Sequence, residues 1–208
     1  MKDNLNEVMG HDVTIESERI SKETGFPVFY DPYFPREMGY NIDMGIIVVN
    51  PLKTAERINF VLRMFPRIDW RDYLRSMFNH EIIHKLEVEF LRSYGVSESE
   101  LREPHYHYAR EVLAVNLFSH PVDYAIWRLS VLVAKPDERK SALEKSPDAW
   151  IKSALYFNED EIRELFGPIG FAEPIIEFKR KAEKVTSYKD MIDFAEWIKG
   201  LRRWRAWT

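Results

Sequence analysis

The sequence predicts an α+β fold that is mostly helical, with a small N-terminal β-sheet and a helical C-terminal region. The chain has 208 residues, of which 45% are hydrophobic, so it can bury a sizeable core. One β-branched run, GIIVV at residues 45–49, has the length and composition of a strand. Apolar residues at helical spacing occupy most of the chain from residue 54 onward.

The N-terminal quarter of the chain carries the predicted sheet. Residues 1–25 are polar and end at Gly25, so we expect a short helix or an arm outside the core. Prolines and glycines then interrupt residues 26–51, which is typical of short strands joined by turns. The run at residues 45–49 is the best strand of this region.

Two helices are expected next. The first covers residues 54–65 and is ended by Pro66. The second runs from about residue 70 to residue 94, with Asp69 as a plausible N-terminal cap and Gly95 after its end. Apolar residues surround most of its circumference, so we expect this helix to lie deep in the protein.

Helices dominate the rest of the chain. Proline stands in the first turn of two predicted helices, residues 104–118 and residues 121–134. Residues 135–149 are polar and predict a surface connection that could include a helical turn. Residues 150–208 predict three or four helices with breaks at Gly167, Gly170 and Thr186. We therefore predict one domain over residues 1–134 and a helical region over residues 135–208 that packs on it.

Composition excludes several classes of protein. The formal net charge of -4 gives no reason to expect a nucleic-acid partner. Without cysteine, the chain has no disulfide, no thiolate metal site and no cysteine nucleophile. The start of the chain is polar and no run of about 20 apolar residues follows, so we expect no membrane span and a cytoplasmic protein. The oligomeric state is not indicated.

The segment FNHEIIHKLE holds the strongest chemical signal. His80 and His84 are four residues apart, so on a helix both imidazoles project from one face and reach one ion. Glu81 lies beside them, where its carboxylate can take a proton from water on a zinc ion. Burying two histidines and a glutamate in an apolar helix is costly unless a metal or hydrogen bonds compensate. The alternative without a metal is two buried histidines satisfied by their neighbours.

A catalytic zinc needs a third protein ligand. A third histidine six residues after His84 is absent, because that position is Phe90. Glu111 is the strongest candidate, since Ala114, Val115 and Phe118 follow it at helical spacing and predict that it faces the core. An ordinary ion pair is the alternative role for Glu111. The other candidate ligands are His105, His107, His120 and Asp123. Among these, His107 is the next choice after Glu111.

Glu87 lies on the same helix face as His84. It is a candidate to orient that histidine from behind. A solvated or paired glutamate is an equal alternative.

The order of these segments resembles the gluzincin metallopeptidases, and in detail the ImmA/IrrE-type domain. The likeness is carried by GIIVVN at residues 45–50, by the histidine segment, and by REVLAVNLFSHP at residues 110–121, where the asparagine is Asn116, one place later than in that family. The resemblance implies that the strand flanks the substrate cleft, that the two histidines bind zinc, and that Glu111 is the third ligand.

Two functions are therefore expected, in different classes. The first is a zinc-dependent metallopeptidase, in which Glu81 activates water on Zn²⁺ against a peptide or protein substrate that the strand at residues 45–49 aligns by β-augmentation. The second is a peptidase-like binding or scaffold protein that holds a metal without turnover. It would dock a partner through its C-terminus, where Trp197, Trp204 and Trp207 stand among basic residues.

Overall fold

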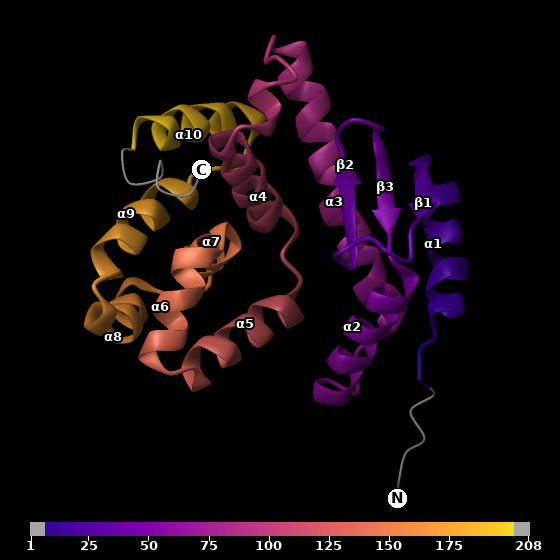
Figure 1. The fold of residues 1–208 in the computed structure, drawn as a ribbon, viewed down its shortest axis with the longest axis horizontal. Helices are drawn as coiled ribbons and strands as arrows, with labels where there is room; N and C mark the ends of the chain where they lie inside the picture. The colour runs from indigo at the N-terminus through magenta and orange to yellow at the C-terminus, as the bar shows by residue number, and fades with distance from the viewer. Residues whose placement is uncertain (1–6, 202–208) are drawn as a thin grey trace, which may run out of the picture. The chain divides into compact units, whose positions relative to one another are not determined.

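The structure, a computed structural model, describes residues 7–201. It contains two compact units, which divide between Val88 and Glu89. The predicted α+β class is confirmed, because a small three-stranded sheet lies near the N-terminus and helices make up most of the rest (Figure 1). Within residues 7–201, no helix has both the length and the apolar character needed to cross a membrane. The domain division predicted after residue 134 stays a prediction.

The sheet of the first unit has its last strand in the middle. Strands β1 (Val28–Tyr30), β2 (Met38–Asn41) and β3 (Ile46–Val49) lie in the order β1-β3-β2 (Figure 1). β3 is parallel to β1 and antiparallel to β2, with Tyr40 opposite Ile47. Because β3 is paired along both edges, it has no edge left for a peptide. The prediction that the strand at residues 45–49 aligns a substrate by β-augmentation is therefore wrong.

Helices α1 (Gly10–Thr24) and α2 (Pro51–Met64) pack together in the first unit, and α1 also contacts β1. From their polar sequence, residues 1–25 were expected to lie outside the core. In the structure Val13 and Ile20 are fully buried, so α1 is part of the core. The helix ends at Gly25, whose φ of 75° lies in the left-handed region that glycine adopts without strain.

Asn50 fixes the junction between β3 and α2. Its side-chain Oδ1 accepts hydrogen bonds from the backbone N–H groups of Leu52 and Lys53, both at 3.1 Å, and so caps α2. Its Nδ2 donates to the carbonyl oxygens of Pro32 and Phe34, both at 2.9 Å. Asn50 is only 1% exposed, and these four bonds satisfy a buried amide.

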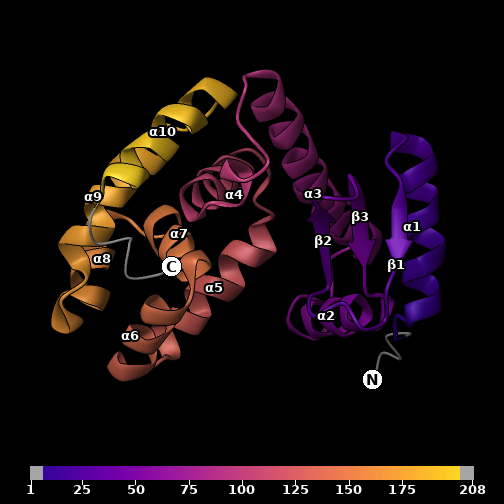
Figure 2. The ribbon, with the colours of Figure 1, turned by 45° about the horizontal axis from the view of Figure 1, so that its top comes forward.

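The second unit is helical throughout its described part. Its elements, in chain order after the end of α3 (Trp70–Ser93), are η1 (Glu100–Arg102), α4 (Pro104–Phe118), α5 (Pro121–Val133), α6 (Pro136–Lys145), α7 (Pro147–Leu155), α8 (Glu159–Phe166), η2 (Gly167–Ile169), α9 (Ala172–Ala182) and α10 (Tyr188–Gly200). Four of these helices begin at a proline, which needs no hydrogen-bond acceptor in a first turn. α4 is central to the unit, since it packs against both α7 and α10 (Figure 2).

A side chain of α4 fastens the connection between α9 and α10. The Nδ2 group of Asn116 donates to the carbonyl oxygens of Ala182 and Val185, at 2.8 and 2.9 Å. These carbonyls belong to the end of α9 and the turn after it, so the two bonds hold that turn against α4. Asn116 therefore has a structural role in this unit.

Two predictions for the C-terminal half have different outcomes. The predicted breaks at Gly167, Gly170 and Thr186 all lie between helices. Residues 135–149 lie largely at the surface, as predicted, but they form a full helix, α6, and the start of α7 rather than a connection with a helical turn. Only Leu143 is buried in α6, so that helix lacks the apolar stripe by which a sequence reveals a helix.

The C-terminal docking surface expected for a scaffold protein is only partly described. Trp197 lies on α10 with its ring centroid 5.4 Å from that of Phe194 and 6.3 Å from that of Phe178, so it belongs to the packing of the helix. Trp204, Trp207 and the neighbouring arginines lie outside the described residues.

Substitution of Asn50 by alanine should lower the free energy of unfolding by about 3 kcal/mol, because it removes a helix cap and the two hydrogen bonds from this buried amide to the carbonyls of Pro32 and Phe34. Urea unfolding measures this. The matched control is Asn158→Ala, since Asn158 caps α8 through a bond to the N–H of Glu161 and should cost only about 1 kcal/mol. Equal losses in the two variants would contradict the role given to the Nδ2 group of Asn50.

Candidate metal centre

The two histidines of the HEIIH segment lie on helix α3, which local contacts hold in place. The carboxylate of Asp69 accepts a hydrogen bond from the N–H of Arg71 at 2.8 Å, so the predicted cap is present. One to two turns further along α3, the side chains of Tyr73, Leu74 and Phe78 are almost completely buried. The backbone that carries the histidines is therefore fixed by packing before any ion is considered.

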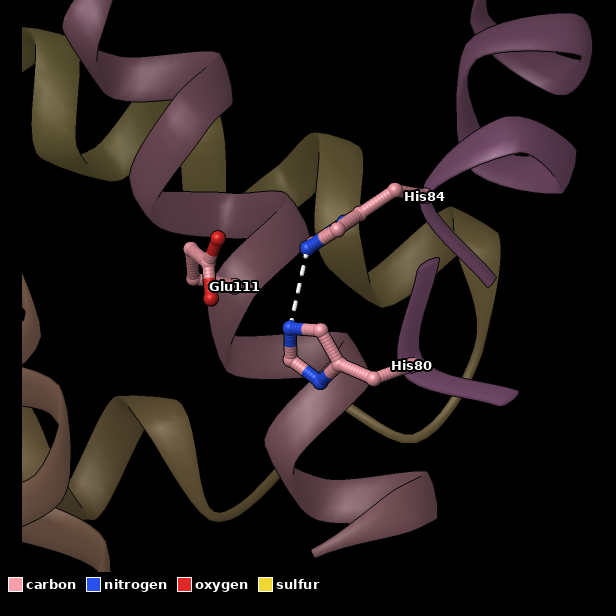
Figure 3. Close-up of side chains that lie close together, drawn as sticks. All are labelled: His80, His84 and Glu111. Atoms are coloured by element: carbon pink, nitrogen blue, oxygen red, sulfur yellow. Dashed lines mark hydrogen bonds between the residues drawn. The ribbon is translucent and has the colours of Figure 1, made fainter. Parts of the chain in front are cut away.

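The imidazoles of His80 and His84 converge. Their Nε2 atoms are 3.1 Å apart (Figure 3). Two histidine nitrogens that bind one tetrahedral zinc ion lie about 3.3 Å apart. The observed spacing therefore fits zinc with little movement of the two rings. The same distance also suits one hydrogen bond between two neutral imidazoles, which satisfies the pair in the absence of a metal.

Glu87 orients His84 from behind. Its Oε2 atom lies 2.8 Å from Nδ1 of His84, and the Glu87 side chain has no exposed surface. A carboxylate accepts the Nδ1–H of the imidazole, so the lone pair of His84 is left on Nε2, the atom that faces His80. The alternative of a solvated Glu87 is excluded by its burial.

Glu81 is held by the sheet. The backbone N–H of Tyr40, in strand β2, donates to Oε2 of Glu81 at 2.7 Å. In an antiparallel pair, alternate residues point their backbone groups away from the partner strand, and at Tyr40 this outward N–H meets the carboxylate. Glu81 is buried, and its Oε1 accepts no hydrogen bond from residues 7–201. One oxygen is thus anchored while the other stays able to accept a proton.

Glu111 lies on α4 between two buried residues, Arg110 and Val112. Each of His80, His84 and Glu111 offers a ligand atom, and these atoms lie within 4.8 Å of one another (Figure 3). Two nitrogens and a carboxylate oxygen form a ligand set that suits zinc and leaves a position for water.

The expectation that α4 turns one stripe toward the core fits only in part. Ala114 and Val115 are buried, whereas Phe118 is 42% exposed.

The other ligand candidates do not join such a group in the described part of the chain. His120 has a different role, since its Nδ1 accepts a hydrogen bond from the N–H of Val122 at 3.2 Å and caps α5. The ring of His107 lies edge to face with Tyr108. Burial lowers the pKa of His105, and the nearby Lys199 adds to that effect.

Sequence reasoning missed Tyr40 as a residue of this site. Its contribution is a backbone N–H, and no side-chain pattern reveals such a group. The only available signal was the strand itself, because an edge strand offers outward N–H groups at alternate positions.

The chain was compared with protein-family models, with curated proteins and with solved structures, and none of the three comparisons finds a match. The resemblance to the gluzincin peptidases therefore rests on the sequence motifs alone.

Replacing Glu87 by glutamine should weaken zinc binding by about ten- to a hundredfold, because the imidazole of His84 loses its anionic partner. Competition with a chromophoric chelator measures the affinity. Glu89→Gln is the matched control, since Glu89 is exposed on the same helix and should leave the affinity unchanged. Wild-type affinity in Glu87→Gln would contradict the orienting role.

Proposed function

We propose that this protein is a zinc-dependent metallopeptidase of the gluzincin type. His80, His84 and Glu111 hold the ion, and Glu81 is the catalytic carboxylate. The observation that carries the proposal is the convergence of the two Nε2 atoms, 3.1 Å apart, with the buried carboxylate of Glu87 behind one of them.

The proposed chemistry divides between the ion and the chain. A bound zinc ion lowers the pKa of its water and polarises the carbonyl of the substrate. Glu81 takes the proton from the water and returns it to the nitrogen of the leaving amine. The bond from the N–H of Tyr40 to Oε2 of Glu81 supports this role, because it fixes the carboxylate one residue from His80.

The substrate is proposed to bind along strand β2 rather than β3. β2 is an edge strand, and its outward N–H at Tyr40 already points to Glu81. An extended peptide that adds to this edge would run past the catalytic carboxylate. The substrate class is therefore a peptide or an extended protein segment.

Glu81→Gln should lower the rate of peptide hydrolysis by about a hundredfold or more while zinc stays bound, because the amide cannot take the proton. Turnover of a peptide library at matched zinc content measures the effect, with Glu89→Gln as the control of equal charge change.

Unchanged hydrolysis in Glu81→Gln would contradict the mechanism. A wild type that binds zinc and cleaves nothing in the library would instead support the alternative of a binding protein with a metal site.

A further inference from the structure

The second unit contains a small cavity that the proposed peptidase chemistry does not use. Helices α5, α6, α7 and α8 all contribute to it, and its volume is about 110 Å³. Its walls are largely apolar, with Val131, Leu143, Ala149 and Phe166 among the lining residues. Cavities of this kind hold small molecules when a few polar groups fix the orientation.

Three polar atoms on lining residues are buried without a hydrogen-bond partner among residues 7–201. They are Nε1 of Trp127, Nε of Arg139 and Oγ of Ser153. Ser153 is only 1% exposed. A nearby indole shows the usual arrangement, since Nε1 of Trp150 donates to the carbonyl of Leu143 at 2.8 Å. Buried donors without acceptors are rare and costly, and three around one cavity point to an acceptor that binds there.

The charge at the cavity favours an anion. Arg139 is held by one bond, from Nη1 to the carbonyl oxygen of Leu165 at 2.6 Å, and none of the described carboxylates forms an ion pair with it. Glu138 also lines the cavity, but its Oε2 accepts from the N–H of Lys135 at 2.7 Å and caps α6. The guanidinium of Arg139 is thus uncompensated, and a carboxylate is its natural planar partner.

We infer that this cavity binds a small organic acid. Its carboxylate accepts hydrogen bonds from Arg139 and Trp127, and the hydroxyl of Ser153 adds a third. Its short apolar body fills the space beside Leu143 and Phe166. A dry cavity of about 150 Å³ holds benzene, so the smaller volume here, about 110 Å³, takes an acid with an apolar body of about three or four carbon atoms. The site is independent of the zinc centre and of peptide hydrolysis.

Titration with propionate and with butyrate, followed by calorimetry and by ¹H–¹⁵N spectra of the tryptophan side chains, tests the inference. We expect saturable binding at one site, with a shift of the Trp127 Nε1–H signal, which is identified by its loss in Trp127→Phe. The neutral probes propionamide and butyramide should bind at least about tenfold more weakly, because they lack the charge that Arg139 recognises.

Variants locate the site. Trp127→Phe and Ser153→Ala should each weaken binding by up to about tenfold, and Arg139→Gln by about a hundredfold. Ser153→Ala should not lower the melting temperature, since its hydroxyl has no hydrogen-bond partner among residues 7–201. Arg163→Gln on α8 is the matched control and should bind as the wild type does, because Arg163 does not line the cavity.

The inference is overturned if neither acid binds saturably, if the amides bind as well as the acids, or if the three variants bind as the wild type does. In each of those cases the cavity is not a carboxylate site. Protein treated with a metal chelator should bind the acids unchanged, so this test is separate from the fate of the zinc site.

Discussion

The bond between His84 and Glu87 is the constraint on which the proposed site depends. A carboxylate with no exposed surface is costly unless its charge is matched by hydrogen bonds, and the Nδ1–H of His84 supplies one at 2.8 Å. The same bond decides which imidazole nitrogen carries the lone pair. That nitrogen faces His80, and the two Nε2 atoms lie 3.1 Å apart, a separation that fits zinc with little movement. Without Glu87, the ring of His84 would lose the hydrogen bond that orients it.

The features of the fold and of the site that depend on local geometry could be predicted from the sequence. The pairing of His80 with His84 follows from the rise and turn of a helix, and helix α4 has the predicted bounds because Pro104 begins it and its apolar content runs to Phe118. The fold class follows from the same kind of reasoning, since one β-branched run and several long helical segments leave few alternatives. Glu111 was chosen as the third ligand from a short-range pattern on one helix, and it remains a proposal.

The features that depend on contacts between residues far apart in the sequence could not be predicted. Three short strands pair in an order set by long-range packing, so the central place of β3 was not visible. The bond from Tyr40 to Glu81 joins residues 41 positions apart through a backbone N–H. The cavity of the second unit was missed for the same reason, because Trp127, Arg139 and Ser153 come from three different helices.

The most direct test of the central claim is the metal content of the protein by mass spectrometry. The protein should be purified without added metal and without a histidine tag, with His84→Ala beside it. The account predicts about one zinc ion per chain in the wild type and its loss in His84→Ala. A wild type that holds no metal, even after zinc is offered and the excess removed, would contradict it, and His80 and His84 would then be a hydrogen-bonded pair of core histidines.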